Sequence, residues 1–308
     1  MTERGLDEYK QELLVNRIAT ALGFERLSNW LDEQSEALPR IPPSYLMFGF
    51  IIIINMGVLE TYNYLIGKNT LIDNPSRIFA TAGVVLAVVG VRWMHETYAQ
   101  SIADLRLPER DLENDAEIKN SFENLLPLRV EVTVYLVALV LYLLNLFFLI
   151  GFSTVVEIEG IVRTLVANFV TIPIYLLLIT EFGLLYFSIH LLLPRKIAQA
   201  DLNMFFYDPQ NMGGFGSTGQ LLKRSYYIYT VGVLVYFGLV YWPEILGEIV
   251  NLKRVYPEPT AIVAVFFIIL WLIGVCSIGY SMYRMHALMS KKKPGSDQGR
   301  RGGYQKQA

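Results

Sequence analysis

The sequence predicts an all-α protein, a polytopic transmembrane helical bundle with six spans and both termini in the cytosol. The first observation behind this is composition, because 53% of the 308 residues are hydrophobic and only 18% are charged. Soluble domains usually contain about 25% charged residues. The others are a series of long apolar stretches and an alternation of basic and neutral segments between them.

Six apolar stretches come close to or exceed the ~20 residues that a helix needs to cross the hydrocarbon. They lie at 44–67, 77–95, 130–152, 162–191, 224–243 and 260–287, within one transmembrane domain at 44–287. The fourth contains Pro173, which removes a backbone hydrogen bond, so we expect a kink there. Segments 96–128 and 194–223 are then cytosolic loops.

Lysine and arginine set the orientation of such a bundle, because cytosolic loops carry an excess of both. With the N-terminus inside, most of the 26 basic residues fall in cytosolic segments and few in outer loops. An even number of spans then returns the C-terminus to the same side. The distribution predicts a multi-pass protein of the plasma membrane with both termini cytosolic.

The two terminal segments differ in pattern. Residues 1–43 are amphipathic, with apolar residues at helical spacing between charged ones, which favours a helix on the membrane surface or against the cytosolic ends of the spans. A solvated helix packed on the protein's own base fits the pattern as well. Residues 288–308 are basic, glycine-rich and without periodicity, so we expect a disordered tail in contact with anionic lipid headgroups.

Several function classes lack support in the sequence. A net charge of −2 argues against a nucleic-acid partner, which would need a clustered basic surface. The single cysteine, Cys276, excludes an intrachain disulfide and a thiolate metal cluster. No GxSxG, HExxH, kinase or P-loop pattern is present, so no residue is assigned to catalysis and no cofactor is predicted.

One polar, glycine-dense segment, 201–219, separates the fourth and fifth apolar stretches. Asp208-Pro209 favours a turn, and Gly213 and Gly214 permit positive φ. Gly216 and Gly219 complete a G-x-G-x-x-G match, but no strand precedes it, as a dinucleotide site would require. We expect a cytosolic mouth or gate formed by Asp208, Gly213, Gly214, Gly216 and Gly219; a tight turn that caps the fifth helix is the simpler alternative.

The residues 208–219 read D-P-x-x-x-G-G-F-x-x-x-G. This segment resembles one in uncharacterised prokaryotic multi-spanning membrane proteins, in which a His/Asp-Pro turn between the fourth and fifth spans leads to Gly-Gly-Leu/Phe and a further glycine. The resemblance extends to the six-span layout. It implies a topology and a cytosolic loop, and no mechanism.

Two glutamates lie at membrane depth, Glu60 in the outer half of the first span and Glu181 in the inner half of the fourth. A charge there costs about 2.5–3.5 kcal/mol on insertion scales, so both side chains should face the bundle interior or water. Asn55 and Asn168 add polar groups in the same spans. These four are candidates for a cation or proton pathway; hydrogen bonding between helices is the alternative.

Three histidines, His95, His190 and His286, lie at the predicted cytosolic ends of the second, fourth and sixth spans. Imidazole is a common metal ligand and titrates near neutrality, so these residues are weak candidates for a metal site. Span ends favour amphipathic side chains in any case.

Three classes of function fit these features. The first is an oligomeric channel or transport-related protein for a small ion, with a homo-oligomer as the expected assembly. The second is a membrane sensor or scaffold that binds partners or lipid through its cytosolic face. The third is an enzyme acting on a lipid at the cytosolic leaflet.

Overall fold

A computed structural model describes residues 12–34, 40–73, 75, 77–105, 120–123, 125–200, 215–250 and 261–292. Throughout these ranges the chain is helical with short connections and no strand, which confirms the all-α class. Five helical runs in these ranges are long and apolar enough to cross a membrane, judged by length and composition. They are Pro43–Leu65, Arg77–Asp104, Asn120–Ile150, Ile161–Gln199 and Val263–Ser290.

These five runs correspond to the first four predicted spans and the last one. Where the fifth was predicted, at 224–243, the structure has a longer helix, α13 (Gly216–Val250). It packs along α6 (Arg77–Asp104) and α14 (Ala261–Lys292), although it is not among the five candidate spans. The sixth span and the sidedness of the termini therefore remain predictions.

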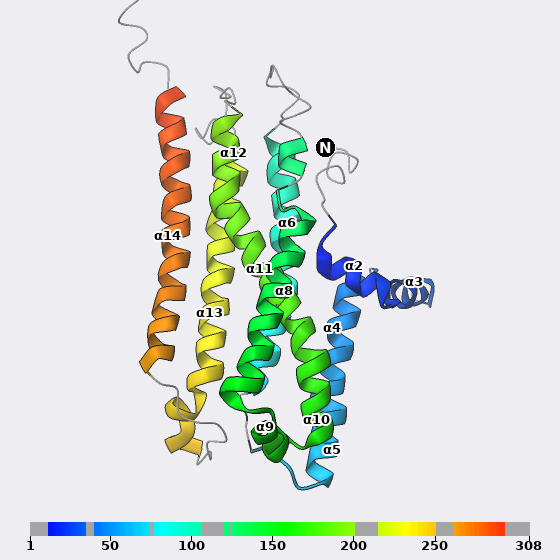
Figure 1. The fold of residues 1–308 in the computed structure, drawn as a ribbon. Coiled ribbons are helices and arrows are strands. Elements are labelled where there is room, and N and C mark those ends of the chain that lie inside the picture. Colours follow the sequence, from blue (N-terminus) through cyan, green and yellow to red (C-terminus); the bar gives the residue numbers. More distant parts are fainter. Residues whose placement is uncertain are drawn as a thin grey trace, which may run out of the picture.

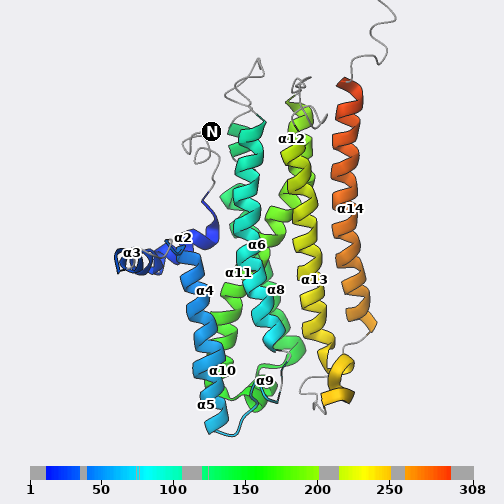
Figure 2. The ribbon, with the colours of Figure 1, turned by 180° about the vertical axis from the view of Figure 1, so that it is seen from behind.

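The long helices stand side by side as columns (Figures 1 and 2). One column consists of α4 (Pro43–Ile53), the π-helix η1 (Ile54–Val58) and α5 (Leu59–Leu65); another consists of α8 (Leu128–Leu144) and the π-helix η3 (Asn145–Ile150). The longest run joins α10 (Ile161–Val166), η4 (Ala167–Thr171), α11 (Ile172–Phe187), η5 (Ser188–Leu192) and α12 (Leu193–Gln199). Helix α9 (Phe152–Glu159) crosses one end of the bundle, here called the α9 end; the opposite end is called the α12 end.

The α10–α12 run crosses the bundle obliquely. Its α10 end is tied to α5 by an ion pair, its middle packs on α6 and α8, and its α12 end packs on α14. The predicted irregularity at Pro173 coincides with a change of helix type, because Pro173 lies in the first turn of α11, directly after η4. A proline without an N–H group is well placed where the hydrogen-bond ladder already changes register.

The amphipathic N-terminal segment forms two helices where one was expected. Gly23, with φ of +88°, ends α2 (Leu14–Ala21) and turns the chain into α3 (Phe24–Gln34). Helix α2 packs against α4, α8 and α11, with Val15 and Ala19 buried. Helix α3 projects sideways from the bundle (Figure 1). The first helix is therefore part of the bundle, and only the second resembles a surface helix.

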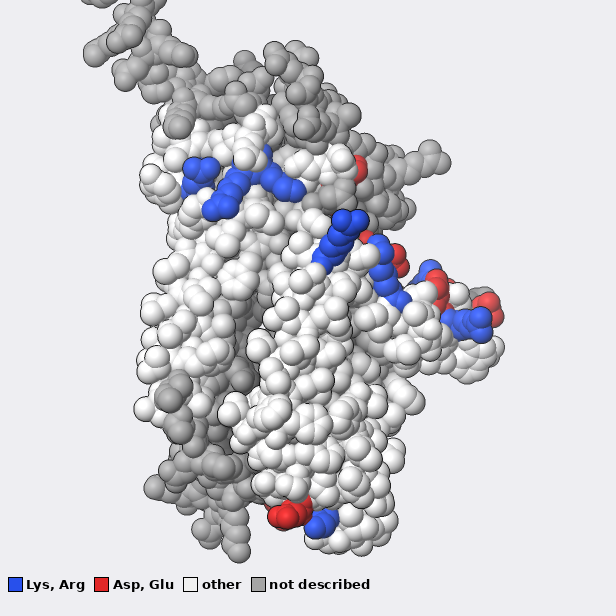
Figure 3. Space-filling view, in the orientation of Figure 1, with Lys and Arg blue, Asp and Glu red and all other residues white. Residues whose placement is uncertain are grey.

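Charged side chains on the face seen in Figure 3 gather near the α12 end and along the arm formed by α2 and α3. A further acidic and basic patch lies at the α9 end, and the wide zone between is free of visible charge. This apolar belt agrees with a protein embedded in a membrane.

Candidate functional site

In the described part of the chain, four π-helical segments interrupt the helices, and each carries a polar side chain. Asn55 lies in η1, Asn145 in η3, Asn168 in η4 and His190 in η5. A π-turn adds one residue to an α-helix and is frequent at functional sites. Hydropathy indicates where a span lies but gives no sign of such an insertion, so the sequence did not predict these segments.

Two of these segments meet in a polar contact. The Asn55 Nδ2 group donates to Thr171 Oγ1 at 2.8 Å, which joins η1 to η4. Tyr142 of α8 donates its hydroxyl to Asn168 Oδ1, and Asn168 Nδ2 donates to the Thr164 carbonyl at 2.7 Å. Polar side chains thus link the first, third and fourth candidate spans. Two predicted pathway residues, Asn55 and Asn168, belong to this network.

Glu60 belongs to a compact ion cluster at the α9 end, which also contains Arg77, Glu159 and Arg163. Glu60 Oε1 lies 2.9 Å from Arg77 Nη1 and 2.7 Å from Arg163 Nη1, and its Oε2 accepts the Leu71 N–H at 2.6 Å. Arg77 and Arg163 both contact Glu159 as well. The four side chains are only 7–13% exposed and come from α5, α6, α9 and α10.

Two carboxylates and two guanidinium groups make this cluster neutral, and both oxygens of Glu60 already have partners. A buried carboxylate held in this way stabilises the arrangement of helices and offers little to a passing cation. The sequence showed Arg77 and Arg163 at the outer ends of spans, near the predicted depth of Glu60. The similar predicted depth of the two arginines and Glu60 was the feature of the sequence that could have predicted their ion pairs.

Glu181 has a different environment, facing Glu131 from the first turn of α8. Both residues are buried, with Glu131 only 3% exposed and Glu181 only 2% exposed. Among the described residues, neither carboxylate has an ion-pair partner within 4.0 Å, and Glu131 Oε2 and Glu181 Oε1 have no hydrogen-bond partner. We call Glu131 and Glu181 the carboxylate pair.

The hydrogen-bond donors to the carboxylate pair are backbone N–H groups at the beginning of α2. Glu181 Oε2 accepts the Val15 N–H at 3.2 Å, and the Leu14 N–H faces both carboxylates. The positive charge of Arg17 attracts the Glu131 carboxylate, but the Arg17 side chain is 43% exposed, and its Nε lies 3.4 Å from Glu12 Oε2. Glu131 was missed in the sequence because it lies one residue inside the predicted third span, where a charge normally faces headgroups.

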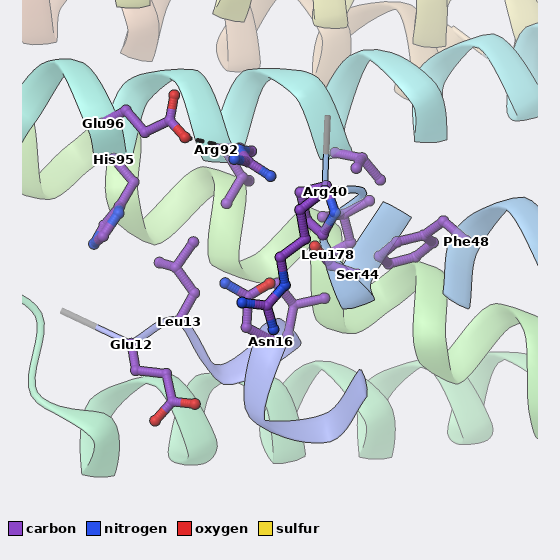
Figure 4. Close-up of a pocket in the computed structure, with 14 residues that line it drawn as sticks. Glu12, Leu13, Asn16, Arg40, Ser44, Phe48, Arg92, His95, Glu96 and Leu178 are labelled. Carbon is purple, nitrogen blue, oxygen red and sulfur yellow. Dashed lines mark hydrogen bonds and ion pairs between the residues drawn. The ribbon is translucent and has the colours of Figure 1, made fainter. Parts of the chain in front are cut away.

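A pocket of about 460 Å³ lies beside the pair, between α2, α4, α6 and α11 (Figure 4). Leu13, Val15 and Leu178 form the part of its wall nearest Glu181, since Val15 binds Glu181 and Leu178 lies one turn before it on α11. The opposite wall on α6 carries Arg92 and Glu96, which are joined at 2.7 Å.

The remaining predicted site residues do not converge. Asp208, Gly213 and Gly214 lie outside the described residues. Gly216 and Gly219 lie in the first turns of α13, so this part of the expected loop is helical.

The three histidines are also far from forming one site. His190 is fully buried, with its ring nitrogens 3.0 Å from Ser225 Oγ and 3.2 Å from Ser281 Oγ. His95 lines the pocket, and His286 is exposed on α14. Within the described part of the chain, no three His, Cys, Asp or Glu side chains are grouped to hold a metal ion.

Comparisons with protein-family models, with curated proteins and with solved structures found no match for this chain. The apolar helices are those of a membrane-embedded protein, and any finer function has to be argued from the geometry of the carboxylate pair, the ion cluster and the pocket.

Proposed function

We propose that this protein transfers protons across the membrane and that the carboxylate pair is its proton-binding site. The observation that carries the proposal is the pair itself, two buried carboxylates in candidate spans without an ion-pair partner among the described residues. Bringing one charge to membrane depth costs about 2.5–3.5 kcal/mol, so two unpaired negative charges are an unfavourable resting state. One proton shared between them removes one charge and their mutual repulsion.

The surroundings of the pair favour a proton over a metal cation. The backbone groups that hydrogen-bond to the pair are the N–H donors of Leu14 and Val15, which repel a bound cation. Cations such as Ca²⁺ or Mg²⁺ require a shell of six or more oxygen ligands. A carboxyl group that holds a proton leaves its neighbour free to accept the same N–H groups.

The polar contacts between Asn55, Thr171, Tyr142 and Asn168 indicate where a proton would go after it leaves the pair. Thr164, Asn168, Thr171 and Tyr175 recur every three or four residues along one side of the α10–α11 run, and Glu181 follows six residues after Tyr175. The Asn55–Thr171 and Tyr142–Asn168 contacts lie on this side, between the pair and the α9 end. In this proposal α13 is the sixth span, both termini are cytosolic, and the α12 end faces the cytosol of a cell with the protein in its plasma membrane as a homo-oligomer.

Proton flux in proteoliposomes tests the proposal. A pH-sensitive dye inside the vesicles reports acidification or alkalinisation driven by a potassium-diffusion potential. Wild-type protein is expected to pass protons, and Glu181→Gln and Glu131→Gln are expected to reduce flux to that of empty vesicles. Glu157→Gln is the matched control, because Glu157 is exposed on α9, the helix that crosses the α9 end of the bundle. Flux that survives in both Gln variants of the pair overturns the proposal.

A second candidate function follows from the α2–α3 arm. Leu22, Leu27 and Trp30 are 58%, 41% and 55% exposed there, beside charged residues of α3. An amphipathic helix of this kind lies in the headgroup region of a bilayer. A sensor or scaffold that reads the cytosolic leaflet would lose its lipid response on Trp30→Ala with Leu27→Ala, while proton flux would not depend on these residues.

A further inference from the structure

The first turn of α2 separates the pocket from the carboxylate pair. Leu13 and Val15 line the pocket, whereas the N–H groups of Leu14 and Val15 face the carboxylates. The same few residues of chain therefore form the pocket wall on one side and hold the pair on the other. A proton that enters through the pocket has to pass this turn.

Helix α2 lacks a cap of its own. Its N-cap residue is Leu13, which makes no side-chain hydrogen bond to the helix, and no acidic residue lies in the first turn. The first N–H groups of a helix need acceptors, and the positive end of the helix favours a nearby anion by about 0.3–2 kcal/mol. Glu131 and Glu181, from two other helices, supply these acceptors. The position of α2 therefore depends on the charge of the pair.

We infer that the first turn of α2 is a displaceable cover over the carboxylate pair, and that the pocket on its other side is the cytosolic access to the pair. This inference rests on the proposed proton transfer. A carboxylate binds the N–H groups of Leu14 and Val15, and it is a weaker acceptor once it holds a proton. Proton binding to the pair thus weakens the hydrogen bonds that hold the cover in place. When the proton leaves towards the α9 end, the carboxylate binds the N–H groups again and the cover returns.

The charged groups around the pocket form partnerships that leave the cover free to move. Arg92 pairs with Glu96 on α6, and Arg17 pairs with Glu12 on the segment that moves. Arg40 donates to Asn29 of α3. Among the described residues, no salt bridge ties α2 to α6, α8 or α11.

Leu14→Pro removes one N–H group with little disturbance of the backbone. Leu14 is the first residue of α2, where proline is favoured. Leu13 has φ of −66° and ψ of 144°, the extended conformation that a residue before proline adopts. Leu14→Ala is the matched control, because it also loses the leucine side chain but keeps the N–H group.

Thiol labelling inside the pocket reports movement of the cover, because Leu13 and Val15 of the cover line the same pocket as Val88 and their displacement widens it. Val88 lines the pocket on α6 and is 8% exposed, and Cys276 is the only native thiol. A Val88→Cys, Cys276→Ala protein in vesicles is treated with a membrane-impermeant maleimide on the side of the α12 end. We expect Leu14→Pro to label about tenfold faster than Leu14→Ala, which corresponds to losing ~1.4 kcal/mol of charge-assisted hydrogen bonding. Labelling to completion should also block proton flux.

A second variant leaves α2 unchanged, in case Leu14→Pro does not fold. Glu131→Gln with Glu181→Gln removes both charges that hold the N–H groups, so it should raise the labelling rate of the Val88→Cys thiol as well. Equal labelling rates in Leu14→Ala and in every folded test variant overturn the cover. Proton flux that stays at the wild-type level after complete labelling of the Val88→Cys, Cys276→Ala protein also overturns the cover.

The two proposals fail in different ways. If wild-type vesicles pass no protons but Leu14→Pro or the double Gln variant labels faster, the cover stands and the proton function falls. If flux depends on Glu181 but labelling rates do not differ, the function stands and the cover falls.

Discussion

Substitution of Glu60 should destabilise the protein without abolishing proton transfer. Glu60→Gln leaves two guanidinium groups and one carboxylate in a site whose side chains are 7–13% exposed, so one positive charge becomes uncompensated. Breaking a buried ion pair from one side costs about 3–5 kcal/mol. With 1.4 kcal/mol for each factor of ten, the ratio of folded to unfolded protein should fall roughly a hundredfold to several thousandfold. The exposed Glu157→Gln should change stability by less than about 0.5 kcal/mol.

Unfolding by SDS in mixed micelles measures these differences, and a double-mutant cycle with Arg163→Gln tests their cause. Glu60→Gln with Arg163→Gln restores neutrality and leaves the Arg77–Glu159 pair, so the double variant should be more stable than the sum of the single losses by about 0.5–3 kcal/mol. If Glu60→Gln and Glu157→Gln unfold at the same SDS fraction, or if the two losses of the double-mutant cycle simply add, the ion pairs of Glu60 do not stabilise the bundle. If folded Glu60→Gln passes no protons, Glu60 belongs to the pathway after all.

Three further predictions concern other parts of the bundle. Gly274→Ala should cost about 1–3 kcal/mol in the same unfolding assay, because a Cβ there would lie 2.2 Å from Tyr229 Cε1; equal stability would show that the ring moves aside freely. Gly160→Ala should cost about 1–2 kcal/mol, since Gly160 has φ of +81° between α9 and α10, and an unchanged midpoint would contradict this. Hydrogen bonds from the Thr70 N–H and hydroxyl lower the pKa of Asp73 from its usual 3.8, so its stabilisation is present at neutral pH and lost as the pH falls below 3.8 and through the lowered value. Titration of the Asp73 carboxyl by NMR should show the pKa move back towards 3.8 in Thr70→Ala, and an unmoved pKa would refute the assignment.

The spans were the most predictable part of the fold. The first predicted span, 44–67, corresponds to Pro43–Leu65, and the fourth, 162–191, corresponds to the first three quarters of Ile161–Gln199. Hydropathy is a local property, so a run of apolar residues gives a span from its own sequence. The additional turns of α12 carry Arg195 and Lys196, which a hydropathy rule reads as the end of a span.

Contacts between distant residues were the least predictable part. Val15 and Glu181 are separated by 166 positions, and nothing in either neighbourhood indicates that they meet. The sequence analysis singled out Glu60 and Glu181 as charges at membrane depth, but treated them alike. The difference between them lies in their neighbours: two arginines surround the first, and a second glutamate faces the other.

The π-helix η4 sets the register between the two halves of the fourth candidate span. Successive residues of an α-helix are rotated by about 100°, so the extra residue of a π-turn shifts everything beyond it by that angle. Deletion of one residue from Ala167–Thr171 would restore a regular helix and swing Glu181 about a quarter turn away from α8, while Arg163 kept its place in the ion cluster. A change of one codon, with no loss of hydrophobicity, would thus separate the two carboxylates and leave the α9 end of the bundle intact.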